Sequence, residues 1–181
     1  MRIIAGAAKG RRLHPPKSPL IRPVSDKVKE AIFNILAEKT DAASVLDLFA
    51  GTGSVGLEAL SRGASRCVFV ESFPHALSLL QKNIVACGFR ESAFVLRGEL
   101  PAILSRLKKK GTFDLVFVDP PYDRGLIGPS LAGLTRYNLI DAQSCVIVEH
   151  SPREAPVSEG LALFDSRKYG QTIVSFLKLC R

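Results

Sequence analysis

Apolar and polar positions alternate in blocks along the chain. Runs of apolar residues that predict buried strands lie at 44–49, 66–71, 93–97, 113–118 and 144–149. The stretches between these runs have the pattern of helices, at 54–62, 74–87, 99–109 and 127–136. Strands and helices that alternate at these lengths are typical of βαβ units, so the pattern predicts a parallel sheet covered by helices.

The pattern changes at both ends of this alternation. Ser25 or Asp26 can cap a further helix, whose predicted buried face is formed by Val28, Ala31, Ile32, Ile35 and Leu36. At the other end, "LALFDSRKYGQTIVSFLKL" predicts two strands joined at Tyr169-Gly170. The predicted fold class is a doubly wound α/β sandwich with five parallel strands and a C-terminal antiparallel hairpin. In such sheets ligands bind beyond the carboxyl ends of the strands.

Positive charge is concentrated at the start of the chain. The 181 residues have the length of one domain and a formal net charge of +8. Residues 1–29 hold eight basic residues and one acidic residue, with glycines and prolines interspersed. We therefore predict an irregular basic arm at 1–24, ahead of a domain at 25–181, and expect the arm to bind a polyanion such as a phosphate backbone.

Composition argues against membrane and metal-dependent classes. No apolar stretch approaches the roughly 20 residues of a membrane span, and the first residues lack the order of a secretory signal. We therefore expect a soluble, cytoplasmic protein with no membrane partner. Neither the histidines nor the cysteines, Cys67, Cys87, Cys145 and Cys180, have a metal-binding spacing. We expect reduced thiols and no metal.

The first predicted strand leads into a glycine-rich turn. In "DLFAGTGSVG", Gly51, Gly53 and Gly56 form a G-x-G-x-x-G pattern between a strand and a helix. This pattern favours close approach of a nucleotide-like ligand to backbone amides. Glu71 ends the next strand, where a carboxylate can accept hydrogen bonds from a ribose diol. Taken alone, these features would also suit a nicotinamide-dependent dehydrogenase.

Asp47 distinguishes S-adenosylmethionine from a nicotinamide dinucleotide as the predicted cofactor. It lies within the strand, at a position that is ordinarily apolar in dinucleotide-binding proteins, and its carboxylate could hold a cationic group. S-adenosylmethionine has an ammonium group, a ribose diol and an adenine, but no pyrophosphate. Asp47, the glycine turn and Glu71 match all of these except the adenine, which Ser72 and Phe73 could flank.

The fourth predicted strand ends in the tetrapeptide Asp119–Tyr122, within "DLVFVDPPYDRG". The amino group of a nucleobase is a poor nucleophile because its lone pair is delocalised into the ring. Two hydrogen-bond acceptors, the Asp119 carboxylate and the Pro120 carbonyl, could draw it toward tetrahedral geometry and stabilise the charge that develops on nitrogen. Pro121 stiffens the turn, and Tyr122 offers a face on which an extruded base can stack. The tetrapeptide is therefore predicted to be an amine-activating clamp.

These motifs also carry a family resemblance. "VLDLFAGTGSVGLEALSRGA", "FVE" and "DLVFVDPPY" resemble class I methyltransferases that act on exocyclic amino groups. "MRIIAGAAKGRRL" and "RPVSDKVKEAIFNIL" resemble, more narrowly, the RsmD family of guanine-N(2) methyltransferases of small-subunit (16S) ribosomal RNA. The resemblance implies S-adenosylmethionine as cofactor and ribosomal RNA, within a small-subunit particle, as partner. We expect the protein to act as a monomer.

The resemblance and the motifs together give the candidate site residues. The catalytic residues are Asp119, Pro120, Pro121 and Tyr122. The cofactor-binding residues are Asp47, Phe49, Gly51, Gly53, Glu71, Ser72 and Glu99. The RNA-binding residues are Arg2, Lys9, Arg11, Arg12, Arg22, Lys27 and Lys29.

Three other functions compete with this interpretation. An adenine-N(6) methyltransferase could use the same clamp, but such enzymes usually carry a target-recognition region for which 181 residues leave no room. A nicotinamide-dependent oxidoreductase leaves the clamp, Asp47 and the basic arm without a purpose. A nucleic-acid-binding module that has lost catalysis is disfavoured by the intact clamp.

Overall fold

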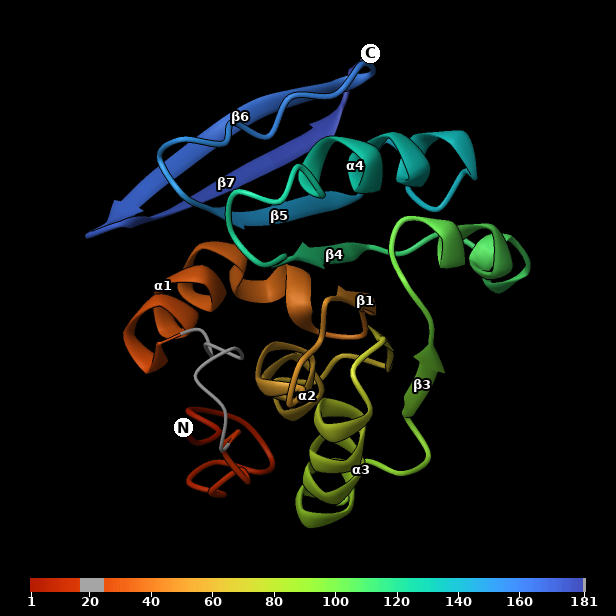
Figure 1. Ribbon diagram of the computed structural model, residues 1–181. Helices are drawn as coiled ribbons and strands as arrows, with labels where there is room; N and C mark the ends of the chain where they lie inside the picture. Colours follow the sequence, from red (N-terminus) through yellow and green to blue (C-terminus); the bar gives the residue numbers. More distant parts are fainter. Residues whose placement is uncertain (17–24, 181) are drawn as a thin grey trace. The chain divides into compact units, whose positions relative to one another are not determined.

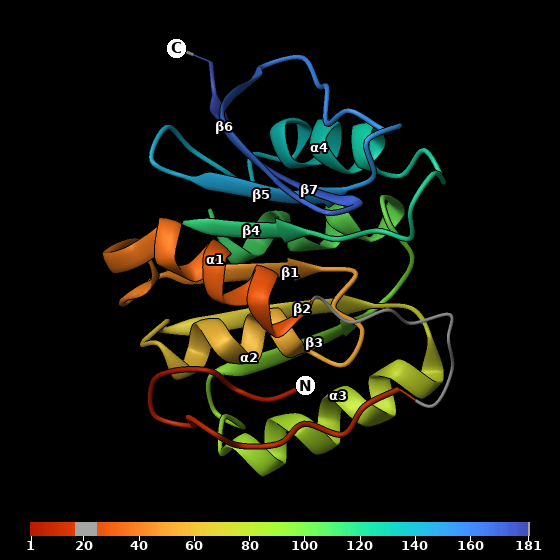
Figure 2. The same ribbon diagram turned by 90° about the vertical axis from the view of Figure 1, so that its left-hand side faces the viewer.

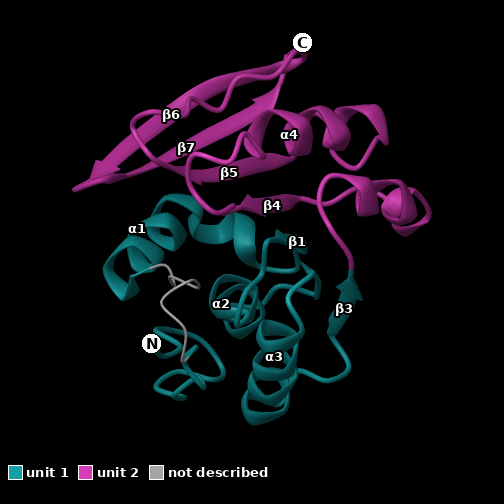
Figure 3. Ribbon diagram, viewed as in Figure 1, with its two compact units in different colours: residues 1–97 teal, residues 98–181 magenta. Residues whose placement is uncertain are grey.

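The computed structural model describes residues 1–16 and 25–180 (Figure 1). The chain divides into two compact units, residues 1–97 and 98–181 (Figure 3). Across the described residues no helix is both long enough and apolar enough to cross a membrane.

The first unit contains three parallel strands and the helices that follow them. Its elements are α1 (Asp26–Leu36), η1 (Ala37–Thr40), β1 (Ser44–Leu48), α2 (Ser54–Ser61), β2 (Arg66–Glu71), α3 (Pro74–Cys87) and β3 (Ala93–Arg97). β2 lies between β1 and β3, and the register pairs Asp47 with Phe69 and Glu71 with Arg97 (Figure 2). The central residues of β1 and β2 are fully buried, which explains their unbroken apolar sequence.

The second unit contains the remaining strands. Its elements are η2 (Ala102–Lys110), β4 (Leu115–Val118), α4 (Ile127–Arg136), β5 (Cys145–His150), β6 (Leu161–Tyr169) and β7 (Thr172–Leu179). β4 and β5 are parallel, and β7 is antiparallel to both β5 and β6. The strand order of the seven-stranded sheet is β3-β2-β1-β4-β5-β7-β6, so the predicted α/β class with a C-terminal antiparallel hairpin is confirmed.

Two helices differ from the sequence pattern. The helix predicted at 99–109 is a 3-10 helix that begins at Ala102, immediately after Pro101. In α1, Ser25 caps the helix as predicted, its hydroxyl accepting the Val28 amide at 3.2 Å. The buried face of α1, however, includes Lys29 and Phe33, whereas Ile35 is 38% exposed. A lysine is costly to bury because of its charge, and only a buried partner offsets that cost.

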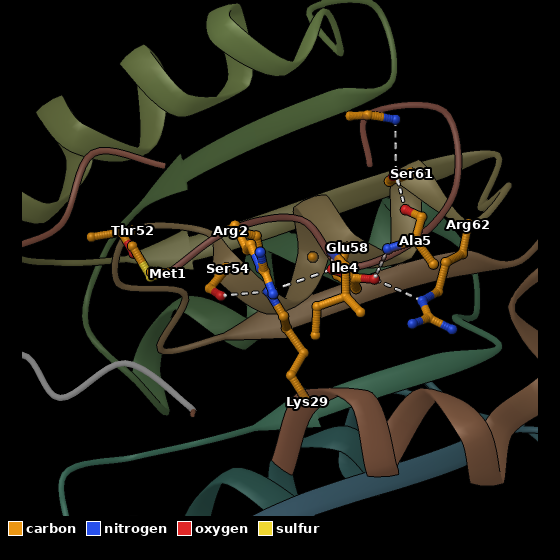
Figure 4. A network of polar contacts seen from close by, with 12 residues as sticks. Met1, Arg2, Ile4, Ala5, Lys29, Thr52, Ser54, Glu58, Ser61 and Arg62 are labelled. Atoms are coloured by element: carbon orange, nitrogen blue, oxygen red, sulfur yellow. Dashed lines mark hydrogen bonds and ion pairs between the residues drawn. The ribbon is translucent and has the colours of Figure 1, made fainter. Parts of the chain in front are cut away.

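That partner is Glu58 of α2, whose carboxylate is fully buried (Figure 4). Glu58 accepts the backbone amides of Ile4 and Ala5 at 2.8 and 3.1 Å and the Arg62 side chain at 2.8 Å. The Lys29 ammonium lies 3.4 Å from the same carboxylate. A single side chain therefore joins the N-terminal arm, α1 and α2.

The described part of the arm is closely packed on α2. A backbone bridge pairs Arg2 with Arg12, which folds residues 1–13 into a compact loop. The amides of Ala7 and Ala8 donate to the carbonyl and the hydroxyl of Ser61, at 2.7 and 2.9 Å. A Cβ atom on Gly6 would overlap the Ser61 carbonyl, and the positive φ of Gly6 also requires glycine. The described part of the arm, residues 1–16, is irregular and is held on α2 by these contacts.

Replacing Glu58 with alanine tests this arrangement. The change leaves the Lys29 ammonium buried without its counter-charge and two arm amides without their acceptor. We expect the free energy of unfolding to fall by about 3–5 kcal/mol, measured by urea denaturation. Glu38→Ala, at an exposed carboxylate in η1, is the matched control and should change stability by less than about 0.5 kcal/mol. Equal losses in the two variants would contradict the role given to Glu58.

Candidate functional site

The turn between β1 and α2 is held by two carboxylates of the first unit. Glu71 accepts the Gly51 amide through one oxygen at 2.7 Å, and the Ser72 and Phe73 amides through the other, both at 2.8 Å. Asp47 accepts the Gly56 amide at 3.0 Å. The structure thus brings six of the seven predicted cofactor residues, Asp47, Phe49, Gly51, Gly53, Glu71 and Ser72, to the carboxyl ends of β1 and β2.

The glycines of this turn are required by geometry. Gly51 and Gly53 have φ values of 55° and 83°, in the region that other residues rarely adopt. A Cβ atom on Gly56 would lie 2.4 Å from the Phe69 ring and 2.7 Å from the Cys67 sulfur. The first two glycines therefore shape the turn, while the third allows α2 to pack closely on β2.

Phe49 adopts an unusual backbone conformation at the end of β1. Its φ is 62°, which for a bulky residue costs on the order of 1–3 kcal/mol and persists only when the surroundings enforce it. The Ala50 amide, next in the chain, donates to the Val70 carbonyl of β2 at 3.0 Å. Such strain is concentrated at functional sites, which fits the assignment of Phe49 to the cofactor turn.

Asp47 is a buried acid with an altered proton affinity. Burial raises the pKa of Asp47 to about 7; the Gly56 amide works in the opposite direction, and the charge of Glu71 adds to the rise. An acid that changes charge near neutral pH is suited to pairing with a cationic ligand group. A bound ammonium would favour the carboxylate form.

The adenine side of the turn is more open. Phe73 directly follows Ser72 and is 54% exposed, an unusual position for a large aromatic side chain. Glu99 is exposed and belongs to the second unit, where its carbonyl accepts the Ile103 amide at 3.0 Å. Its proposed contact with the cofactor stays a prediction.

The predicted clamp lies directly after β4 in the second unit. Pro120 is buried, Asp119 and Tyr122 are half-buried, and Pro121 is exposed. The Tyr122 hydroxyl donates to Glu149 at 3.0 Å and lies 3.0 Å from the Thr172 hydroxyl. Burial is the main cause that raises the pKa of Tyr122, so the phenol stays protonated and remains a donor. The tyrosine ring is therefore fixed by its hydroxyl.

The residue after the clamp is also held firmly. Asp123 has a φ of 57°, its amide donates to Glu154 at 3.0 Å, and its carboxylate accepts the Ser151 hydroxyl at 2.7 Å. With two prolines before it and these contacts after it, the tetrapeptide has little conformational freedom.

Sequence reasoning missed the two residues that anchor Tyr122. Glu149 is the penultimate residue of β5, and Glu71 is the last residue of β2, so an acidic residue near a strand end was an available signal. Thr172 carried no such signal, because only the pairing of β6 with β7 determines its place. Within the described residues no cluster of potential metal ligands is found. All four cysteines are free, and Cys67 and Cys145 are buried.

Most of the predicted RNA-binding residues lie at the surface of the first unit. Arg2, Lys9, Arg11, Arg12 and Lys27 are exposed. Lys29 is not: its ammonium binds the Arg2 carbonyl at 2.7 Å and the Ser54 hydroxyl at 3.2 Å in addition to Glu58. The assignment of Lys29 to an RNA surface is therefore corrected. Arg22 lies outside the described residues, as does the predicted arm boundary at residue 24.

Comparisons with known proteins agree with these motifs. "Putative rRNA methyltransferase YlbH" of Bacillus subtilis is 35% identical over 181 residues, 98% of each chain. "Ribosomal RNA small subunit methyltransferase D" of Escherichia coli is 37% identical over 150 residues, 82% of this chain and 74% of the relative. The solved structure "Putative methyltransferase yhhF from Escherichia coli" matches with a TM-score of 0.85 and 32% identity, over 99% of this chain and 97% of that one.

A family model covers almost the whole chain. The model described as "Conserved hypothetical protein 95" matches residues 1–178, which include the arm, the glycine turn, the clamp and the hairpin. The solved neighbours include methyltransferases, consistent with a class I methyltransferase fold. The chain belongs to this family, the RsmD family of methyltransferases, as its sequence motifs indicated.

Proposed function

We propose that this protein transfers the methyl group of S-adenosylmethionine to the exocyclic 2-amino group of a guanine in small-subunit ribosomal RNA. Ribosomal RNA as the acceptor is supported by the names of the relatives from B. subtilis and E. coli. The observation that carries the chemistry is the rigid Asp119–Tyr122 clamp, whose tyrosine is fixed by Glu149 and Thr172.

The first unit has groups that suit each part of the cofactor. Asp47 would pair with the ammonium group, and Glu71, whose Oε2 accepts only the Gly51 amide and keeps a further lone pair, would accept from a ribose hydroxyl. Ser72 and Phe73 would border the adenine. S-adenosylmethionine supplies an electrophilic methyl group when bound. The positive φ values of Gly51 and Gly53 and the strained Phe49 give the turn a shape that ordinary packing does not require.

The clamp would act on the target amino group. Asp119 and the Pro120 carbonyl would each accept one N–H bond, which directs the nitrogen lone pair at the methyl carbon. The cofactor would supply the methyl carbon, with its sulfur as the leaving group, and the Asp119 carboxylate or solvent would take the proton that the nitrogen loses once the new nitrogen–carbon bond has formed. Tyr122 would hold the extruded base by stacking.

The substrate and assembly state complete the proposal. A basic arm beside the methyltransferase domain favours recognition of RNA by shape and protein context, as in a partly assembled small-subunit particle. We propose that the protein acts on such a particle as a monomer.

Methyl transfer to ribosomal subunits tests the proposed function. Small subunits from cells that lack this enzyme would be incubated with protein and labelled S-adenosylmethionine, and the RNA digested to nucleosides. Label in 2-methylguanosine is the expected result. Label in a methyladenosine, or label in DNA and none in subunits, would instead support the adenine-N(6) alternative.

Asp119→Ala should abolish most of the activity. Loss of one acceptor from the clamp should lower kcat by roughly 10²-fold or more, since the interaction is strongest in the transition state. The affinity for S-adenosylmethionine, measured by calorimetry, should change little. Glu159→Ala, at an exposed acid of the same unit, is the control and should leave kcat unaltered. An Asp119→Ala enzyme of normal kcat would refute the clamp mechanism.

Cofactor affinity should depend on pH through Asp47. Because burial raises the pKa of Asp47 to about 7, the carboxylate that pairs with an ammonium forms only as the pH rises through that value. We expect the affinity for S-adenosylmethionine to increase about 10-fold between about pH 6 and pH 8, measured by calorimetry. Asp47→Asn should bind weakly and without this dependence.

The ligand-free protein should show the opposite trend. The folded state holds the Asp47 proton more tightly than the unfolded state, so this group makes stability fall between about pH 4 and about pH 7. Thermal melts of Asp47→Asn should lack that decrease, whereas Glu30→Gln, at an exposed acid of α1, should retain it. Identical pH profiles for wild type and Asp47→Asn would contradict the assignment.

The exposed arginines of the arm should contribute to RNA affinity. Replacing Arg11 and Arg12 with glutamine should weaken binding and reduce the slope of log affinity against log salt by about 0.7 for each lost phosphate contact. Fluorescence titrations at several salt concentrations measure both effects. Changing Lys39 and Lys82, exposed cations elsewhere in the first unit, should reduce the slope much less. Similar reductions in both pairs would mean that the arm holds no specific contacts.

A further inference from the structure

The turn of the β6–β7 hairpin lies close to the clamp within the second unit. β6 ends at Tyr169 and β7 begins at Thr172, so two residues, Gly170 and Gln171, form the connection. Gly170 has a φ of 64°, as expected for the first central residue of a tight hairpin turn. A Cβ atom on Gly170 would meet nothing within 4 Å, so the turn projects into open space.

A hydrogen bond ties this turn to the clamp. The Thr172 hydroxyl lies 3.0 Å from the Tyr122 hydroxyl, and Thr172 is the first residue after the turn. In the register of the hairpin, Tyr169 is directly opposite Thr172. Side chains of directly opposed residues share one face of the sheet, so Tyr169 lies on the face that Tyr122 reaches. The turn therefore borders the place where Tyr122 would hold the target base.

The chemistry of the turn suits single-stranded RNA. Lys168, Gly170 and Gln171 are exposed, and Tyr169 is half-buried. An aromatic ring, a cation and an amide on a projecting turn are the groups that stack on bases, meet phosphates and bind polar base edges. Lys168 is the cation nearest the turn, and the preceding Arg167 is paired with Asp165 at 3.1 Å.

We propose that the hairpin turn, Lys168–Gln171, binds the RNA strand next to the target nucleotide. Tyr169 stacks on a flanking base, Lys168 contacts a phosphate, and Gln171 donates to or accepts from a base or the backbone. The Tyr122–Thr172 hydrogen bond sets the spacing between this surface and the clamp. This inference rests on the proposed RNA methyltransferase function and adds a second RNA contact to that of the arm.

The test is a comparison of steady-state kinetics on small ribosomal subunits. The double variant Lys168→Ala, Gln171→Ala changes two exposed side chains and should fold normally, which thermal melts would verify. We expect its KM for subunits to rise about 5-fold or more, its kcat to stay within about 2-fold, and its S-adenosylmethionine affinity to stay unchanged. Its salt slope for RNA binding should fall by about 0.7.

Tyr169→Leu provides an independent variant that keeps apolar bulk. Loss of one stacked base should raise the KM about 10-fold. Lys178→Ala is the matched control, since Lys178 is an exposed cation of the same hairpin that pairs with Ala162. It lies six residues beyond Thr172, about 20 Å away along the strand. Its KM should match that of the wild type.

Each outcome has a distinct meaning. A wild-type protein that transfers no methyl group to subunits would refute the proposed function itself. A wild type that methylates subunits, with Lys168→Ala, Gln171→Ala and Tyr169→Leu unchanged in KM, would refute only the hairpin contact. An equal rise in KM for Lys178→Ala would also refute it, because the effect would then be general electrostatics.

Discussion

The buried carboxylate of Glu58 is the interaction on which the first unit depends. It satisfies two backbone amides of the arm, neutralises Lys29 and binds Arg62 (Figure 4). A buried charge is tolerated only with such a set of partners, and loss of the carboxylate would leave the two arm amides without their acceptor and Lys29 without its counter-charge. The Glu58 carboxylate therefore fixes the described part of the arm and α2 relative to each other.

The same network of contacts reaches the glycine turn, because α2 begins there. The Lys29 ammonium reaches Ser54, the first residue of α2. The Asn83 side chain of α3 accepts the His14 amide at 2.7 Å and donates to the Thr52 carbonyl at 2.9 Å. The arm is thus linked to the glycine turn through two side chains, those of Lys29 and Asn83. A ligand bound to the arm would therefore contact the same unit that holds the glycine turn.

The success of the sequence patterns has a physical cause. The parallel strands β1, β2, β4 and β5 are buried along nearly their whole length, so their apolar runs admit few other interpretations. The glycine pattern succeeded because positive φ values and close helix packing both exclude side chains. Constraints of this kind act between residues that are close in the chain, so a short stretch of sequence is enough to predict them.

The positions that sequence reasoning missed depend instead on residues that are distant in the chain. Lys29 was assigned to the surface because its charge was considered without Glu58, which is distant in sequence and meets it only in the fold. Thr172 was missed because its role depends on the pairing of β6 with β7. Side chains that act through tertiary partners carry no periodic signal, and the site therefore extends beyond its motifs.

The second unit restricts the clamp in three independent ways. Proline rings fix the backbone of Pro120 and Pro121, hydrogen bonds fix the Tyr122 hydroxyl, and Ser151 and Glu154 fix Asp123. Each constraint removes conformational freedom before any substrate arrives, so less entropy is lost when an amino group is bound. A clamp organised in advance needs little help from other parts of the protein to align its target. Under the proposed function, this preorganisation would let a chain of 181 residues combine a cofactor turn, an amine-binding clamp and an RNA-binding arm.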